Sequence, residues 1–496
     1  MLTFLSPLAF MWTGFGVEPY LVKDINTLAD TAGSNPAKFC ALGSHVYFTA
    51  ETSATGIELW KSDGTVDGTK LVRDIREGTS SSSPGGLEVV GDTLFFYAND
   101  GIHGVELWKS DGTHEGTVMV KDIFAGSNSS NPVLWAAVGN TLFFHARDGL
   151  TGAELWKSDG TTEGTVLVRD IVEGGGSPGV GDGTAVGGAF YFQANDGNSG
   201  QELWKSDGTE AGTIMVKDIR EGSSSSFPGN LVALGSTLYF TASDGSGGPG
   251  LWKSDGTADG TVMVKAVGSL GLSELVAVGN ILYFRANDPT HGAELWKSDG
   301  TEAGTLLVKD IVAGNGGSYP SWLRGMDNIL YFVANNGVNG EELWKSDGTP
   351  EGTEMVKDIR EGSISPGLWG LTVVGSNLYF RAHDGISGEE LWKSDGTETG
   401  TILLKDIVAG TAGSSPLYLT AVGETLYFRA DDGIHGDEFW KSDGTSDGTI
   451  MVKDVAGGTS GSFPAYPTRI GAFYLFRADD GIHGSELWKT DGTEDG

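Results

Sequence analysis

One eight-residue run occurs ten times in this chain, and it constrains the fold more than any other feature of the sequence. Successive copies lie 48 residues apart, except for a spacing of 44 residues between the fifth and sixth copies. A repeat period between about 20 and 50 residues is typical of propellers, solenoids and related arrays. The run is ELWKSDGT or differs from it at one position, and its copies begin at Glu58, Glu106, Glu154, Glu202, Gly250, Glu294, Glu342, Glu390, Glu438 and Glu486.

Each repeat contains four short runs rich in Val, Ile, Tyr, Phe and Trp, the residue types that favour strands. In the middle of the chain these are the runs around Trp204 and Val216, the apolar run that ends at Gly235, and the alternating run around Tyr239. The Asp-Gly pair of each SDGT segment suits a hairpin, because glycine accepts a positive φ and aspartate bonds its own backbone. No helical period appears, so each repeat predicts four antiparallel strands.

A link rich in Ser and Gly separates successive repeats and ends in proline in nine places. Proline cannot donate a hydrogen bond to a strand ladder, so it marks where one sheet stops and the next begins. These prolines are Pro36, Pro84, Pro132, Pro178, Pro228, Pro320, Pro366, Pro416 and Pro464.

A four-stranded unit of this length has the size of one blade of a β-propeller. Strands that are apolar on both faces need neighbours on both sides, and a closed ring supplies them to every blade. The last repeat stops before its fourth strand, whereas residues 21–25 copy that strand near the start of the chain. We therefore predict an all-β fold for residues 20–496: a β-propeller of about ten four-stranded antiparallel blades in one ring, closed by an N-terminal strand.

The fifth repeat is irregular and leaves a second architecture open. Gly250 replaces the repeated Glu, Ala266 replaces a repeated Asp, and the link that follows is four residues shorter and lacks its proline. Two five-bladed propellers, or an open stack of units, are therefore the alternatives to one ring.

Charge and composition exclude several classes of partner. The chain holds 32 Lys and Arg against 66 Asp and Glu, a net charge of -34, which repels nucleic acid and anionic membrane surfaces. No stretch approaches the roughly 20 apolar residues of a membrane span, so we expect no membrane insertion. Residues 1–19 are largely apolar, and we interpret them as a degenerate export signal or an ordered apolar N-terminal segment.

The run ELWKSDGT, followed by GTxxVKDI, is similar to the repeats of the bacterial ELWxxDGT family. The similarity covers essentially all of residues 20–496, with departures at Gly250, Phe439 and Thr490. The resemblance implies a repeat protein that is extracellular or attached to the bacterial cell surface. We expect the chain to be either a monomer or part of a larger chain. It implies a propeller-type fold but no defined activity, and it supplies no catalytic residues.

Two repeated columns favour structural roles over binding. A tryptophan in every copy, as at Trp204, is more economically explained by packing between blades than by sugar stacking. An aspartate in every SDGT segment, as at Asp207, is explained by turn chemistry.

Calcium is the one cofactor that the repeats suggest. Each DGxxG loop begins with Asp, and a Glu follows six residues later, so oxygen ligands lie on a Gly-rich turn. Calcium binds about six to eight oxygens, so backbone carbonyls or a neighbouring blade would have to contribute. In the alternative, the Glu pairs with a strand lysine such as Lys121. The candidate ligands are Asp100, Glu106, Asp148, Glu154, Asp196, Glu202, Asp384, Glu390, Asp432, Glu438, Asp480 and Glu486.

Residues that do not repeat are better candidates for a specific site. Trp135, Trp322 and Trp369 occur only near the first strand of their units, which lies near the axis or a face of a propeller. There they are candidate platforms for a ligand, and packing is the alternative explanation.

These observations favour a non-catalytic binding or adhesion module whose partner is carbohydrate, another surface polymer or a surface protein. Ten similar units would provide multivalency. A structural scaffold in a larger surface protein is one alternative. A sialidase- or glycosidase-like hydrolase is the other, but it needs a unique group of carboxylates and arginines that near-identical repeats do not supply.

Overall fold

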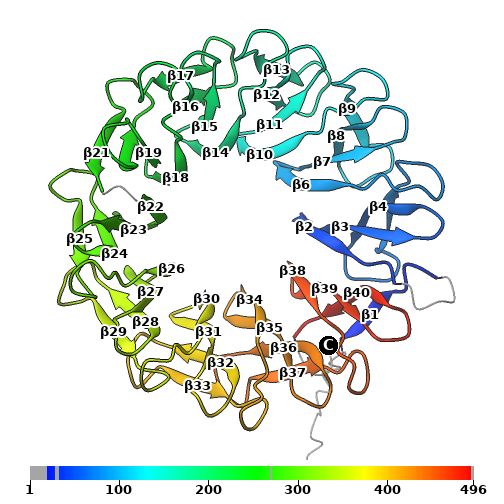
Figure 1. The fold of residues 1–496 in the computed structure, drawn as a ribbon. Helices are drawn as coiled ribbons and strands as arrows, with labels where there is room; N and C mark the ends of the chain where they lie inside the picture. The colour runs from blue at the N-terminus through cyan, green and yellow to red at the C-terminus, as the bar shows by residue number, and fades with distance from the viewer. Residues whose placement is uncertain (1–18, 28–32, 268–270, 493–496) are drawn as a thin grey trace, which may run out of the picture.

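The protein is a ring of ten four-stranded antiparallel sheets, each of them one blade of a β-propeller (Figure 1). The computed structural model describes residues 19–27, 33–267 and 271–492. One ring is therefore confirmed, and the alternatives of two five-bladed propellers and an open stack are wrong. The predicted export signal or apolar segment, residues 1–19, lies outside the described residues except for its last residue. The described part of the chain contains no helix that could cross a membrane.

We number the blades from one to ten, and in the first nine the strands run from the ring axis outwards in chain order (Figure 1). The innermost strands are β2 (Ala37–Leu42), β6 (Gly85–Val90), β10 (Val133–Val138), β14 (Gly181–Val186), β18 (Gly229–Leu234), β22 (Leu272–Val278), β26 (Ser321–Met326), β30 (Trp369–Val374), β34 (Leu417–Val422) and β38 (Ala465–Ile470). The second strands are β3 (His45–Thr52), β7 (Thr93–Asn99), β11 (Thr141–Arg147), β15 (Ala189–Asn195), β19 (Thr237–Ala242), β23 (Ile281–Asp288), β27 (Ile329–Asn335), β31 (Asn377–His383), β35 (Thr425–Asp431) and β39 (Phe473–Asp479).

The outer half of each blade carries the repeated run. The third strands are β4 (Gly56–Ser62), β8 (Val105–Ser110), β12 (Ala153–Ser158), β16 (Gln201–Ser206), β20 (Gly250–Ser254), β24 (Gly292–Ser298), β28 (Glu341–Ser346), β32 (Glu389–Ser394), β36 (Asp437–Ser442) and β40 (Ser485–Thr490). The outermost strands are β5 (Lys70–Arg73), β9 (Val118–Lys121), β13 (Val166–Arg169), β17 (Ile214–Lys217), β21 (Val262–Ala266), β25 (Leu306–Lys309), β29 (Glu354–Lys357), β33 (Ile402–Lys405), β37 (Ile450–Lys453) and β1 (Tyr20–Lys23).

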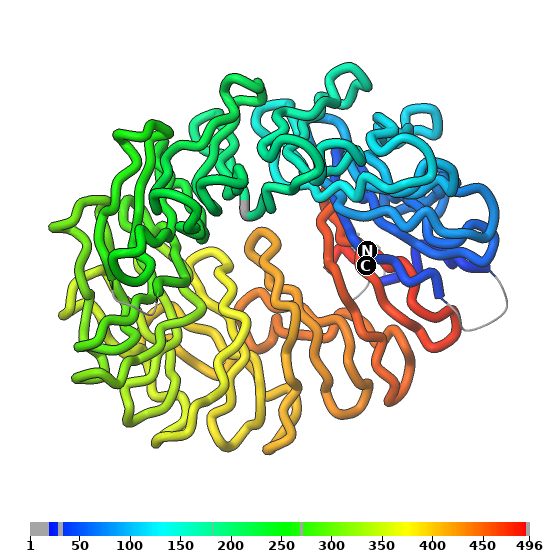
Figure 2. Tube along the Cα trace, turned by 45° about the horizontal axis from the view of Figure 1, so that its top comes forward, coloured from blue at the N-terminus to red at the C-terminus, as the bar shows by residue number. Residues whose placement is uncertain are grey.

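The ring closes as predicted, because β1 is the outermost strand of the last blade. It pairs antiparallel with β40, and Leu21 lies opposite Trp488. Figure 2 shows this first described strand (blue) beside the last blade (red). Val22 is completely buried, in one cluster with Phe48 of the first blade and Leu487 of the last. The closing strand therefore belongs to the core between the last and first blades.

The repeated tryptophans pack between blades, as predicted for this column, and each is at most 9% exposed. Trp204 of the fourth blade, for example, lies in one cluster with Phe143 and Leu155 of the third blade. A large ring fills the space between two twisted sheets.

Removing one of these tryptophan side chains should destabilise the interface between two blades. We expect Trp204→Ala to lower the free energy of unfolding by about 3–5 kcal/mol, since it leaves a cavity. Urea denaturation followed by tryptophan fluorescence and circular dichroism measures this change. Phe227, which is 66% exposed, is the aromatic control, and its replacement by Ala should change stability by less than about 0.5 kcal/mol. Equal losses for the two variants would contradict the packing role.

The repeated aspartate holds the turn between the third and outermost strands, as predicted. Asp207 Oδ1 accepts hydrogen bonds from the backbone N–H and the hydroxyl of Thr209, at 2.8 and 2.7 Å. The carboxylate lies against Gly212, where a side chain would collide with it. This explains why the second glycine of SDGTxxGT occurs in every copy.

A cation at the end of the outermost strand links each blade to the next one. Lys121 Nζ donates to the carbonyl oxygen of Thr165 at 2.8 Å and lies 6.0 Å from the ring centroid of Trp156. The predicted alternative in which a repeated Glu pairs with Lys121 is therefore wrong. The same link crosses the closure, where Lys453 Nζ donates to the carbonyl oxygen of Pro19 at 2.7 Å.

Candidate functional site

The repeated glutamates, six of them candidate calcium ligands, are buried side chains that hold the links between blades. Glu106 is fully buried and accepts hydrogen bonds from the N–H of Ile123 at 3.0 Å and of Ser130 at 2.9 Å. Its second oxygen also accepts the Ser130 hydroxyl at 2.6 Å. The remaining members, equally buried, are Glu154, Glu202, Glu390, Glu438 and Glu486. Their oxygens therefore face the chain of the following link.

The residue that faces each glutamate from the following link decides how well the glutamate is satisfied. After Glu58 this residue is Ser82, which donates its N–H and its hydroxyl to Glu58, at 2.8 and 2.5 Å. Burial raises the pKa of Glu58 to about 7, although these hydrogen bonds oppose the rise. At Glu154 the corresponding residue is Pro178, which has neither donor, and burial raises the pKa of Glu154 to about 8.

The candidate aspartates organise the DGxxG loops. Asp100 Oδ1 accepts the N–H groups of Ile102 and His103, both at 2.8 Å, and its Oδ2 lies 2.6 Å from the Nδ1 atom of His103. Equivalent loops contain Asp148, Asp196, Asp384, Asp432 and Asp480. Among the described residues, no three His, Cys, Asp or Glu side chains form a group that could hold a metal ion. Calcium binding at these loops stays a prediction.

The second residue of the innermost strand differs between blades and lies at a bulge. The register between the first and second strands shifts at this point, as between Leu417 and Thr420. The second residue of the strand has a positive φ of 56° at Trp322, 56° at Tyr418 and 59° at Tyr466. Such a φ is rare for bulky residues, and strained backbone is concentrated at functional sites.

Aromatic rings and arginines form an arc around the axis over blades seven to ten, which we call the aromatic arc. Trp322 and Trp369 contact each other edge to face, with centroids 5.8 Å apart. The guanidinium of Arg381 lies 5.5 Å from the ring centroid of Trp369. Arg429 over Tyr418 and Arg477 over Tyr466 repeat this arrangement, each at 5.5 Å.

Of the three predicted platform tryptophans, the structure brings only two together. Trp322 and Trp369 are half-buried neighbours in the aromatic arc. Trp135 lies on β10, away from the arc (Figure 1), and stacks on His145 and Phe190 with centroids 5.6 and 5.9 Å apart.

A groove continues the aromatic arc where the last blade meets the first. Tyr418 and Tyr466, about half exposed, line it together with Phe39, and it encloses about 420 Å³. Phe39 stacks on Tyr466 with centroids 6.0 Å apart. The groove therefore combines aromatic rings with the aliphatic and hydroxyl side chains of Leu419, Thr420, Pro467 and Thr468.

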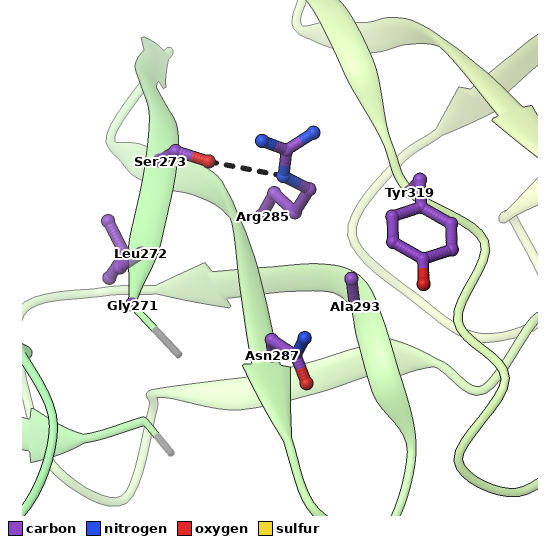
Figure 3. Close-up of a pocket in the computed structure, with 7 residues that line it drawn as sticks. All are labelled: Gly271, Leu272, Ser273, Arg285, Asn287, Ala293 and Tyr319. Atoms are coloured by element: carbon purple, nitrogen blue, oxygen red, sulfur yellow. Dashed lines mark hydrogen bonds between the residues drawn. The ribbon is translucent and has the colours of Figure 1, made fainter. Parts of the chain in front are cut away.

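A second cavity of about 400 Å³ lies in blade six, and we call it the Arg285 pocket (Figure 3). Arg285 Nε donates to the Ser273 hydroxyl at 3.1 Å, and its Nη1 donates to the Pro320 carbonyl at 3.4 Å. The ring of Tyr319, 57% exposed, stands across the pocket from Arg285. The lining residues are Gly271, Leu272, Ser273, Arg285, Asn287, Ala293 and Tyr319.

Arg285, Arg381 and Arg429 occupy equivalent positions on the second strands of their blades, but their partners differ. Arg381 pairs with Glu389 at 3.3 Å and Arg429 pairs with Asp437 at 3.2 Å, each on the neighbouring third strand. In blade six, Ala293 stands where Glu389 and Asp437 stand in blades eight and nine. The described residues therefore give Arg285 no ion pair. Sequence analysis missed this pocket, although the signal was present: an alanine in place of an acid, beside the irregular link.

No protein-family model and no curated protein matches this chain. Among solved structures, a computationally designed protein has 17% identity and a TM-score of 0.36, over 71% of this chain and 95% of its own. A puromycin hydrolase has 14% identity and a TM-score of 0.35, over 94% of this chain and 61% of its own. A prolyl endopeptidase has 15% identity and a TM-score of 0.36, over 70% of this chain and 53% of its own. Such similarities carry no argument about the activity of this chain.

Proposed function

We propose that this chain is a non-catalytic module outside the cell that binds carbohydrate or another surface polymer on the aromatic arc. The observation that carries the proposal is the bulge position, where Trp322, Tyr418 and Tyr466 occupy strained backbone beside the ring axis. Sugar rings stack on exposed aromatic faces, and rigid aromatic side chains lose little conformational entropy on binding. The similarity of the repeats to bacterial ELWxxDGT proteins supports the location outside the cell.

A structural scaffold and a hydrolase, the two alternative functions, explain the aromatic residues at the bulge less well. A scaffold needs the repeated residues, which the core and the links use, but it has no need for aromatic rings at strained positions. A hydrolase needs two carboxylates about the reacting bond, in one place. The fully buried glutamates each face the amides of a link instead, as Glu106 does.

The proposal predicts that the groove tyrosines contribute most of the binding. We expect the intact chain to bind at least one polysaccharide on a glycan array, and the double variant Tyr418→Ala, Tyr466→Ala to bind it at least about tenfold more weakly. Stacking on one aromatic ring contributes about 1 kcal/mol or more, and 1.4 kcal/mol is tenfold in affinity.

Phe473 provides the matched aromatic control. It is 38% exposed and lies at the turn between β38 and β39, at the opposite end of the blade from the start of β38. The Phe473→Ala variant should bind as the intact chain does. No binding to any polysaccharide by the intact chain would contradict the proposal and favour a scaffold.

A further inference from the structure

The Arg285 pocket combines a cation with uncharged surroundings in a chain whose net charge is -34. None of its seven lining residues is acidic. At the corresponding place in blades eight and nine, Glu389 and Asp437 neutralise the arginine. In blade six, Ala293 contributes only a methyl group, and it lines the cavity together with Arg285 (Figure 3). Two other blades of the chain therefore show which chemical group fits beside such an arginine.

The guanidinium of Arg285 is oriented before any ligand arrives. Ser273 and Pro320 accept two of its hydrogen bonds. A guanidinium has five N–H donors, so three remain for a ligand. Planar donors held in this way suit the two oxygens of a carboxylate.

The opposite side of the pocket is suited to a sugar ring. Tyr319 is 57% exposed, and its backbone is anchored, because its N–H donates to the carbonyl of Ala293 at 2.9 Å. Asn287 adds an uncharged amide, which can donate to or accept from hydroxyl groups. A volume of about 400 Å³ lies at the small end of ligand pockets, which favours one monosaccharide unit over a larger group.

We propose that the Arg285 pocket binds the carboxylate of a uronic acid unit in an acidic polysaccharide, and that Tyr319 stacks on the sugar ring. The inference rests on the proposed function, since it names the ligand class of the same binding module. The carboxylate of an acidic peptide has the same charge, but it carries no sugar ring for Tyr319.

The experiment compares two ligands that differ only in charge. Oligogalacturonate and its methyl ester are titrated into the full chain by calorimetry at about 150 mM salt, which weakens unspecific attraction. We expect the acid to bind at least about tenfold more tightly than the ester, since hydrogen bonds to charged groups are the strong ones. The variant Arg285→Ala should remove this difference.

Two further variants distinguish binding in the Arg285 pocket from a general effect of the net charge of the chain. Ala293→Glu keeps Arg285 but supplies the acid found at Glu389, and it should also remove the preference for the acid. Arg220→Ala removes an equal charge from the link between blades four and five, and it should keep the preference. The melting temperature of each variant shows whether the ring is intact.

The outcomes distinguish the inference from the proposed function. Equal binding of acid and ester by the intact chain would overturn the inference and leave a neutral-glycan module standing. Binding of neither these ligands nor any other polysaccharide would overturn both. Arg285-dependent binding of polyglutamate without binding of oligogalacturonate would overturn the sugar ligand.

Discussion

Deleting residues 1–27 is expected to open the ring and to lower the melting temperature by at least several degrees. The deletion removes β1, and with it Val22 and Ile25, which are 0% and 6% exposed. Burial of two such side chains contributes about 3–6 kcal/mol. The hydrogen bond from Lys23 Nζ to the Thr69 carbonyl, at 2.8 Å, is lost as well. Differential scanning calorimetry measures the effect.

Two controls isolate the strand itself. A chain that lacks only residues 1–18 keeps β1 and separates its contribution from that of the preceding residues. The full-length variant Val22→Asp places a charge in the core between the last and first blades without shortening the chain. It should be destabilised as strongly as the deletion, because a buried unpaired charge is costly.

The open ring should also associate. Removal of β1 leaves β40 as an unpaired edge, and such edges pair with other chains. Size-exclusion chromatography should therefore show larger species for the deletion than for the intact chain. An unchanged melting temperature together with an unchanged elution volume would mean that β1 does not close the ring.

The fold was predictable because the same four strands recur with nearly constant spacing. Even the closing strand, expected at residues 21–25, lies at Tyr20–Lys23. One repeat determines the blade, and ten copies with one surplus strand determine the ring. The shortened link of the fifth repeat leads into β22 and does not divide the ring.

The roles of the charged residues were less predictable, because their partners lie in other segments. Asp100 and Glu106 are close in sequence, which suggested a shared ion. In the structure Glu106 instead bonds to Ile123 and Ser130, 17 and 24 residues later. Lys121 reaches Thr165, in the next blade. Spacing within one repeat contains no information about such contacts.

The Arg285 pocket was also not predictable from the spacing of residues within the repeat. Sequence analysis found no unique group of carboxylates and arginines, because the repeats are nearly identical. Arg285 differs from Arg381 in the residue diagonally opposite on the third strand, which is Ala293 beside Arg285 and Glu389 beside Arg381. The difference becomes visible only when the register of the two strands is known.

The stability of the ring is expected to fall as the pH rises from about 5 to about 9. Burial raises the pKa of Glu154 and Glu342 to about 8, from the ordinary value of 4.5. Between pH 4.5 and about pH 8 the folded chain binds more protons than the unfolded chain, so the free energy of unfolding decreases as the pH rises. The stabilisation is complete below about pH 4.5 for these groups and is lost as the pH passes 8.

Glu154 and Glu342 should dominate this effect because their links provide the fewest donors. Pro178 and Pro366 stand where Ser82 serves Glu58, and a proline has neither an N–H nor a hydroxyl. A carboxylate that forms at either site therefore lacks the hydrogen bonds that would offset its loss of water.

The double variant Glu154→Gln, Glu342→Gln tests the cause, because glutamine keeps the shape and cannot ionise. At pH 9 it should be more stable than the intact chain by at least about 2 kcal/mol, since one pKa unit corresponds to about 1.4 kcal/mol. At pH 5 the two proteins should be similar, because the glutamates are then protonated. Thermal melts at pH 5, 7 and 9 give the comparison, and Glu58→Gln should have a smaller effect.

The overall charge of the chain acts in the same direction and must be separated from the buried groups. Repulsion within a chain of net charge -34 also grows with pH, but it is spread over the surface and is screened by salt. Buried carboxyls are screened much less, so the gain of the double variant at pH 9 should persist at about 0.5 M salt. Parallel loss of stability in the intact chain and the double variant would assign the pH dependence to surface charge and remove the buried glutamates as its cause.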